Sequence, residues 1–241
     1  MQDLSLLLAD YRILIHAKYD YVVKQCAAYT APHPLTPEEA DLEIEVSEEE
    51  IRDDMLNTEN KVTPGYSESI CIYRAICREI PRMGGMLLHA AVISDGRYGY
   101  AFTANSGTGK TTHIRQWLQA YGEDIRVING DKPILRKRGG VWYAYGTPWC
   151  GKEGLNVNTS VPLAGICFLR RGERNVIHPF SVASAVTEIM PQLLFPEKPE
   201  ALLATLDLLD QLLAEVPLYE LYCTISEEAA KVAREAMEPK G

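Results

Sequence analysis

The residues best suited to chemistry lie in one glycine-rich segment, Ala104-Asn-Ser-Gly-Thr-Gly-Lys-Thr-Thr112. It differs from the phosphate-binding pattern G-x-x-x-x-G-K-S/T only at Ala104, where the pattern has a glycine. Gly107 and Gly109 allow backbone N–H groups to surround a phosphate. Lys110 is placed to reach the β- and γ-phosphates, and the Thr111 hydroxyl to bind Mg²⁺. The segment predicts a site for ATP and Mg²⁺, to which four further loop residues contribute: Asn105, Ser106, Thr108 and Thr112.

An acid and a histidine outside this loop are candidates for the catalytic step. Magnesium in such sites is commonly held by a second group, an acid at the end of a neighbouring strand. Asp131 follows a predicted strand at 125–128 and is predicted to bind Mg²⁺ and to orient or deprotonate an acceptor hydroxyl. His89, expected on the strand before the loop-bearing strand, is predicted to lie near Asp131. A buried histidine bonded only to backbone is the alternative.

Three further charged residues are weaker candidates. Arg170 and Arg171 end an apolar strand, where a guanidinium could clamp the γ-phosphate or be ordinary surface charge. Glu68 begins a predicted helix, where it could contact a serine-like or ammonium acceptor, or simply suit the helix dipole on a solvated face. The other histidines, His113 among them, are expected to be structural or exposed.

Local patterns predict the elements that position these residues. Alternating apolar and acidic residues at 42–46 favour a half-exposed strand, and Ser47 with Glu50 forms a capping box that begins a helix. A helix is expected over 66–80. Further strands are expected at 11–17, 86–94, 98–104, 125–128, 163–170 and 217–223. Segments 134–138 and 141–146 are expected to form a hairpin about Gly139 and Gly140, and a strand at 175–180 is expected to pair with 163–170. Further helices are expected at 110–120, at 181–194, at 199–215 and from the Ser226 cap.

The fold class that follows is α/β, or α+β with a mixed sheet, and a helical C-terminal part. Residues 1–64 are expected to form an N-terminal α+β extension that recognises substrate, and 65–241 the core. The leucine stripe at 202–213 is expected to be core or the contact of a homo-oligomer.

Composition and charge limit the class of protein. The 241 residues, 46% hydrophobic and 24% charged, are typical of a soluble globular protein and exclude a disordered chain or a disulfide miniprotein. The net charge of −9 argues against a nucleic-acid or membrane binder. Residues 86–180 nevertheless carry twelve basic against six acidic side chains, which suggests a local anion site. Six scattered cysteines without a C-x-x-C pair and the absence of a signal or spanning segment predict a cytoplasmic protein.

Taken together, these residues resemble the superfamily of HPr kinase/phosphorylase and ATP-dependent phosphoenolpyruvate carboxykinase. Residues 106–112 are similar to the carboxykinase loop, and the order His89, loop, Asp131 is similar to the HPr kinase core. Segments 129–133, 145–149 and 151–154 are similar to short HPr-kinase-related, serine kinase-like proteins. The resemblance implies a P-loop core and transfer of the γ-phosphoryl of Mg-ATP to a serine-like hydroxyl on a small molecule, peptide or protein. It also implies a substrate role for Trp149, Lys152 and Glu153.

The chain departs from that family at Gly130, where the family has the first of two adjacent acids. Two alternatives to a kinase stay open: a non-catalytic ATP-binding sensor, in which Gly130 marks lost chemistry, and a carboxykinase-like lyase. If Gly130 marks a lost catalytic acid, Gly130→Asp is expected to raise a low activity.

Overall fold

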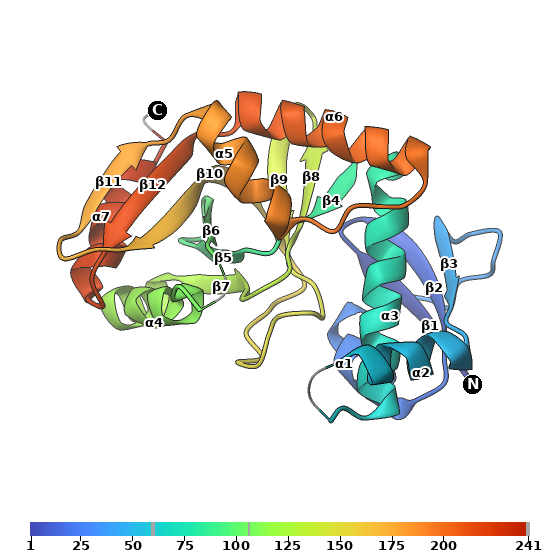
Figure 1. Cartoon of the computed structure of the whole chain (residues 1–241). Helices are drawn as coiled ribbons and strands as arrows, with labels where there is room; N and C mark the ends of the chain where they lie inside the picture. Colours follow the sequence, from blue (N-terminus) through green and yellow to red (C-terminus); the bar gives the residue numbers. More distant parts are fainter. Residues whose placement is uncertain (59–60, 106, 240–241) are drawn as a thin grey trace.

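A computed structural model describes residues 1–58, 61–105 and 107–239 of the chain. It shows a mixed α/β protein in which a three-stranded sheet and a larger curled sheet of nine strands are accompanied by seven α-helices in the described residues (Figure 1). The mixed α/β class predicted from the sequence is confirmed.

The small sheet is built from the first 45 residues. Strands β1 (Gln2–Leu8) and β2 (Tyr11–Ala17) pair antiparallel across a turn in which Ala9 and Asp10 have φ of 52° and 63°. Strand β3 (Leu42–Glu45) joins β2 in parallel. Strands at 11–17 and 42–46 were expected, whereas β1 was missed because Asp3 and Asp10 flank its short apolar run.

Three helices pack with this sheet: α1 (Asp20–Cys26), α2 (Glu48–Asn57) and α3 (Pro64–Glu79). The predicted capping box is present, with the Ser47 side chain accepting from the Glu50 N–H and the Glu50 carboxylate from the Ser47 N–H. Buried α3 residues such as Ile72 and Ile76 share a core with Ile13 and Ile15 of β2. Helix α3 thus contributes to the N-terminal core as well as preceding the large sheet.

The large sheet has the order β4-β8-β9-β10-β6-β5-β7. In addition, β12 pairs with β10, and β11 pairs with the other edge of β12. The long strand β10 (Ser160–Arg171) pairs antiparallel with β9 through its first residues and parallel with β6 and β12 through the rest. This change of partner joins an antiparallel part to a part with both parallel and antiparallel pairings. The remaining strands are β4 (Gly85–Leu87), β5 (Ala91–Ser94), β6 (Gly99–Thr103), β7 (Arg126–Asn129), β8 (Ile134–Arg138), β9 (Val141–Tyr145), β11 (Val176–Pro179) and β12 (Leu218–Cys223).

Helices cover both faces of this sheet, as the alternation of β10 side chains shows. Ile166 and Phe168 pack toward α5 (Val182–Ile189) and α6 (Pro199–Glu215). Cys167 and Leu169 pack in the cluster of α4 (Lys110–Tyr121) and α7 (Glu227–Met237). Short 3-10 turns complete the described elements at Ala27–Tyr29, Ile80–Met83, Gly122–Asp124 and Met190–Gln192. Within the described ranges, no helix is both long and apolar enough to cross a membrane.

Three local expectations are corrected. The strand expected at 86–94 is two strands, β4 and β5, that belong to different parts of the sheet, and His89 lies in the bend between them. Strand β11 pairs with β12, which lies between it and β10, so the expected direct pairing of 175–180 with 163–170 is wrong. Ser226 is the N-cap of α7, but its side chain makes no capping hydrogen bond and instead meets Asn175 and Thr224.

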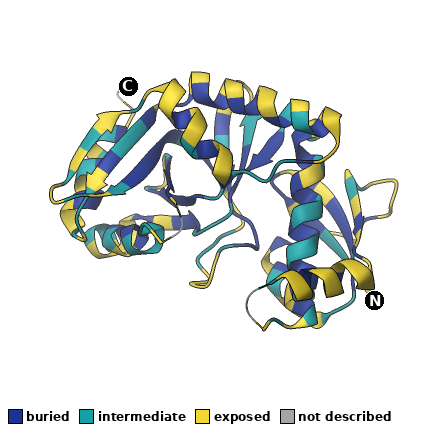
Figure 2. Cartoon of the chain, viewed as in Figure 1, coloured by how far each residue is buried: buried dark blue, intermediate teal, exposed yellow. Residues whose placement is uncertain are grey.

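The leucine stripe of α6 divides between core and surface. Leu208, Leu209, Leu212 and Leu213 are buried against the sheet, whereas Leu203 is 63% exposed. Figure 2 shows α6 with a buried and an exposed side along its length. The buried leucines therefore form core, and a subunit contact stays a prediction for the exposed ones.

Candidate functional site

The glycine-rich loop joins β6 to α4, as the phosphate-binding pattern requires. Gly107 and Gly109 have φ of 76° and 125°, in the region that side chains with a Cβ disfavour. Ser106 lies outside the described residues. Lys110, the first residue of α4, extends back along the loop with Nζ 3.4 Å from the Ala104 carbonyl oxygen. Burial lowers the pKa of Lys110, and the nearby Asp131 carboxylate opposes that shift.

Asp131 and His89 meet at this loop. His89 Nε2 donates to Asp131 Oδ1 at 2.9 Å, and Lys132 Nζ lies 3.5 Å from Oδ2. Burial favours the neutral acid, but the His89 hydrogen bond and the charges of Lys132 and Lys110 outweigh it and lower the pKa of Asp131. Asp131 is therefore an ionised carboxylate at neutral pH. The alternative of a histidine bonded only to backbone does not hold for His89.

Backbone contacts around the bend between β4 and β5 bring these two residues together. The His89 N–H donates to the Gln192 carbonyl at 2.8 Å, and the Ala90 N–H to the Asp131 carbonyl at 3.0 Å. On the other side, buried Asn129 accepts the N–H groups of Asp131 and Lys132 at 2.9 and 2.7 Å. Asn129 was not among the predicted residues, although its position just before Asp131 fits an Asx-type turn.

A cavity of about 530 Å³ surrounds this pair and the start of α4. It brings together the predicted residues His89, Asn105, Gly107, Gly109, Lys110, Thr111, Thr112, Asp131, Lys152 and Glu153. Gly130 and Cys150 also line it. Glu153 is held over α4 by Arg115, whose Nη2 lies 3.0 and 3.1 Å from its two carboxylate oxygens. The loop that carries Lys152 and Glu153 is thereby tied to the helix that follows the phosphate loop.

Gly130 has no room for the acid found at the equivalent place in the resembled family. A Cβ there would lie 2.9 Å from the Cys150 carbonyl oxygen and 3.5 Å from that of Leu155. The Gly130 N–H donates to the same Leu155 carbonyl at 2.9 Å. Because backbone atoms surround the position, the expectation that Gly130→Asp raises activity is revised: the substitution would displace the 150–155 loop.

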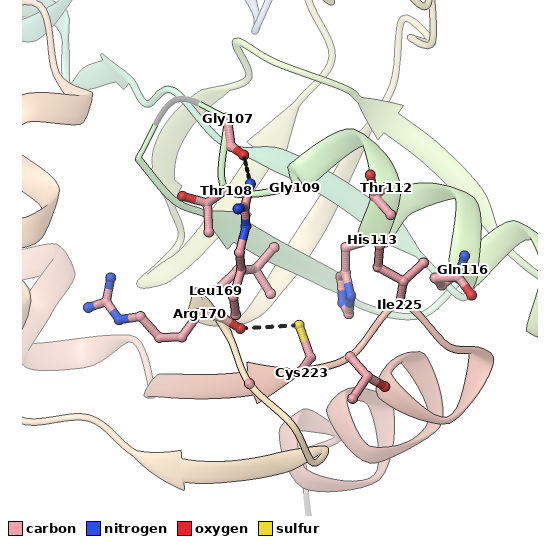
Figure 3. A pocket seen from close by; sticks show the side chains of 13 residues that line it. Gly107, Thr108, Gly109, Thr112, His113, Gln116, Leu169, Arg170, Cys223 and Ile225 are labelled. Carbon is pink, nitrogen blue, oxygen red and sulfur yellow. Dashed lines mark hydrogen bonds between the residues drawn. The ribbon is translucent and has the colours of Figure 1, made fainter.

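A second cavity, of about 700 Å³, lies on the other side of the loop. Gly107, Gly109 and Thr112 line both cavities, and Thr108 lines this one. Other lining residues are His113, Gln116, Leu169, Arg170, Arg171, Cys223, Thr224 and Ile225 (Figure 3). The two cavities therefore meet at the glycines and form a groove across the N-terminus of α4.

The two arginines differ in what they contact. Arg171 donates from Nη2 to the Gly107 carbonyl at 2.7 Å, so it reaches the phosphate loop. Arg170 is paired with Glu188 at 2.6 Å and with Glu220 at 3.0 Å. A guanidinium engaged by two carboxylates is not available to clamp a phosphate, so the prediction for Arg170 is corrected to a structural role.

Glu68 is also a structural residue. It is 0% exposed and accepts the N–H groups of Lys18 at 2.6 Å and Tyr19 at 3.0 Å. These groups lie at the start of α1, whose N-cap residue, Tyr19, makes no side-chain capping bond. The carboxylate of Glu68 therefore satisfies the backbone N–H groups of the two residues that precede α1, and it lines neither of the two cavities.

Trp149 is likewise turned away from the site. It is 5% exposed, and its indole N–H lies 3.0 Å from Ser69 Oγ and 3.2 Å from the Ser69 carbonyl oxygen. Its ring packs on Tyr73, with the centroids 5.6 Å apart. The predicted substrate contact of Trp149 is thus corrected to a link between the site loop and the N-terminal core.

Comparison with known proteins provides little beyond this geometry. No protein-family model and no curated protein matches the chain. Among solved structures, the chain is similar to the Hpr(Ser) kinase/phosphatase from Coxiella burnetii, with a TM-score of 0.32 and 13% sequence identity over 64% of this chain and 93% of that one.

Proposed function

We propose that the protein is a phosphotransferase that moves the γ-phosphoryl group of Mg-ATP to a serine-like hydroxyl. The observation that carries the proposal is the hydrogen-bonded pair of His89 and Asp131, which lines the same cavity as Lys110 and Thr111. A carboxylate beside a phosphate-binding loop is the arrangement that phosphoryl transfer needs, because catalysis there depends on positioning and charge.

The two joined cavities suggest how the nucleotide lies. The phosphates would occupy the cavity with Lys110 and Asp131, where backbone N–H groups and the N-terminus of α4 favour an anion. The nucleoside would occupy the larger cavity beyond Gly107 and Gly109. Arg171, bonded to the Gly107 carbonyl, lies beside the loop between them and would add positive charge near the phosphates.

The residues present fit Mg²⁺ better than a metal with an all-protein ligand set. Mg²⁺ is usually bound by one or two carboxylates together with phosphates and water. Thr111 and Asp131 line one cavity, and in the described residues no group of three or more His, Cys, Asp or Glu side chains could hold a metal. When bound, the ion would neutralise the charge that develops on the phosphates.

The transfer itself would use Asp131 as acceptor of the proton from the attacking hydroxyl. The hydroxyl oxygen forms the new bond to the γ-phosphorus, and the bond to the bridging oxygen breaks, leaving its electron pair on ADP. His89 donates to Oδ1, so Oδ2, which lies 3.5 Å from Lys132 Nζ, would receive the proton. Lys110 would stabilise the transferred group, and Lys152, in the same cavity, would contact the acceptor.

A second function, ATP binding without transfer, is favoured by one observation. The resembled family has two adjacent acids, whereas here only Asp131 is present and the space at Gly130 is closed by backbone. A protein of this kind would hold ATP in the same groove and signal its presence without forming a product.

The test is incubation with Mg-ATP and a panel of free serine, other hydroxy compounds and serine-containing peptides, followed by mass spectrometry of ADP and phosphorylated product. Lys110→Ala should abolish transfer. The control is Lys137→Ala, which removes a lysine of strand β8 that pairs with Glu215 of α6, and it should leave transfer intact. Unchanged transfer in Lys110→Ala would refute the proposed mechanism. ATP binding with no product from any acceptor would identify the sensor instead.

A further inference from the structure

His113 is a buried histidine whose tautomer is set by its neighbour. It lies on α4, is 4% exposed, and packs edge-on to Phe102 with the ring centroids 4.5 Å apart. Trp117 donates its indole N–H to His113 Nε2 at 3.0 Å. Because an indole nitrogen only donates, Nε2 must be the unprotonated nitrogen, and the neutral ring carries its proton on Nδ1. Burial lowers the pKa of His113 to about 3, so the ring is neutral at physiological pH.

The Nδ1–H group of His113 has no partner in the described part of the chain. It is one of only two buried side-chain polar atoms there without a hydrogen bond, the other being Ser67 Oγ. Buried donors in folded proteins are normally paired, and leaving one unpaired is unfavourable. The His113 side chain lines the larger cavity and its Nδ1 is buried, so a bound acceptor would meet this donor once the side chains that cover it shift.

The cavity beside His113 offers both apolar surface and polar groups to a bound base. Leu169 and Ile225 supply apolar surface, and Gln116 and Thr224 supply polar groups. Figure 3 shows the His113 ring extending from α4 toward the strand that carries Cys223. The opposite end of the cavity is the phosphate loop, through Gly107 and Gly109. A ligand in it with phosphates on the loop would have its base at the His113 end.

We propose that His113 is a specificity-determining residue, whose Nδ1–H donates a hydrogen bond to a ring nitrogen of a purine base bound in the larger cavity. The inference rests on the proposed function, in that the groove binds a nucleoside triphosphate. Adenine, the purine of ATP, offers three ring-nitrogen acceptors that the sugar does not occupy, N1, N3 and N7. A base analogue with a C–H group at the contacted position would lose the bond and place the C–H against the buried donor.

The experiment measures dissociation constants of Mg-ATP and of 1-deaza-, 3-deaza- and 7-deaza-ATP by calorimetry, with wild-type protein and His113→Leu. Wild type should bind one of the three analogues about five- to tenfold more weakly than ATP, the size of one neutral hydrogen bond. His113→Leu should bind ATP more weakly by a similar factor and should not distinguish that analogue from ATP. His178→Leu, which removes an exposed histidine on β11, is the matched control and should discriminate as wild type does.

The outcomes separate the inference from the proposed function. Equal binding of ATP and all three analogues by wild type would overturn the role of His113 while leaving a nucleotide site. Discrimination that persists unchanged in His113→Leu would also overturn it. No binding of any nucleotide by wild type would overturn the proposed function itself. If His113→Leu does not fold, His113→Phe, which keeps a ring at this position and lacks the N–H donor, replaces it.

Discussion

His89 and Asp131 form a hydrogen bond of 2.9 Å between two chain segments that both lie outside strands, one in the bend before β5 and the other in the turn after β7. The backbone N–H of each partner is held by a further hydrogen bond, that of His89 to the Gln192 carbonyl and that of Asp131 to the Asn129 side chain. The carboxylate is therefore oriented before any ligand binds.

His89→Gln should impair transfer without weakening nucleotide binding. The glutamine cannot hold Asp131 Oδ1 in the same orientation, and loss of a residue that orients a metal-binding carboxylate typically costs about 10- to 100-fold in activity. We expect kcat to fall by that factor while the dissociation constant of ATP without metal is unchanged. Steady-state kinetics and calorimetry measure the two effects, and His178→Gln serves as the control. A wild-type kcat in His89→Gln would mean that the pair has no part in the reaction.

Gly130→Asp should damage the site instead of improving it. Its Cβ would meet the Cys150 carbonyl oxygen at 2.9 Å, and overpacking of this kind costs about 1–3 kcal/mol. We expect a lower free energy of unfolding in urea and lower transfer activity. Gly139→Asn is the matched control, because a Cβ at Gly139 has no neighbour within 4 Å and asparagine tolerates its φ of 57°. Increased activity in Gly130→Asp would show that the 150–155 loop can move aside and that an acid was lost.

Replacement of the two adjacent arginines should affect different properties, ATP affinity for Arg171 and stability for Arg170. Arg171→Met removes the guanidinium bonded to Gly107 and should weaken ATP binding by roughly tenfold, with little change in stability. Arg170→Met leaves Glu188 and Glu220 without their shared partner and should lower the free energy of unfolding by about 1–2 kcal/mol. Calorimetry and urea unfolding of both variants test this. Equal loss of ATP affinity in the two would mean that Arg170 also contacts the phosphates.

Stability should depend on pH through His16 on β2. Its ring nitrogens lie 2.8 Å from a Glu43 carboxylate oxygen and 2.7 Å from one of Asp3, and these hydrogen bonds raise the pKa of His16 above its ordinary value of 6.5. A raised pKa in the folded state means that the stabilisation is fully present below pH 6.5 and is lost as the pH rises through the folded value. The free energy of unfolding should therefore fall above pH 6.5 in wild type, and less so in His16→Gln. Parallel pH profiles for the two proteins would show that His16 does not contribute.

Local sequence signals predicted the elements that a short stretch of chain can form alone. Interactions within a few residues set four of these features. They are the loop glycines with positive φ, helix α4 after them, the hairpin about Gly139 and Gly140, and the capping box at Ser47. The same signals placed Lys110, Thr111 and Asp131 as candidates, because the phosphate-binding pattern and an acid after a strand are local features.

Only the tertiary structure decided what the long side chains contact, because their partners come from distant parts of the chain. Glu68 meets Lys18 and Tyr19, Trp149 meets Ser69, and Arg170 meets Glu188 and Glu220. The insertion of β12 between β10 and β11 is likewise a pairing across many residues. No spacing or periodicity encodes such contacts, since a carboxylate or guanidinium is equally compatible with solvent, a ligand or a buried partner. The sequence determined where the phosphate loop is, and packing determined which side chains face it.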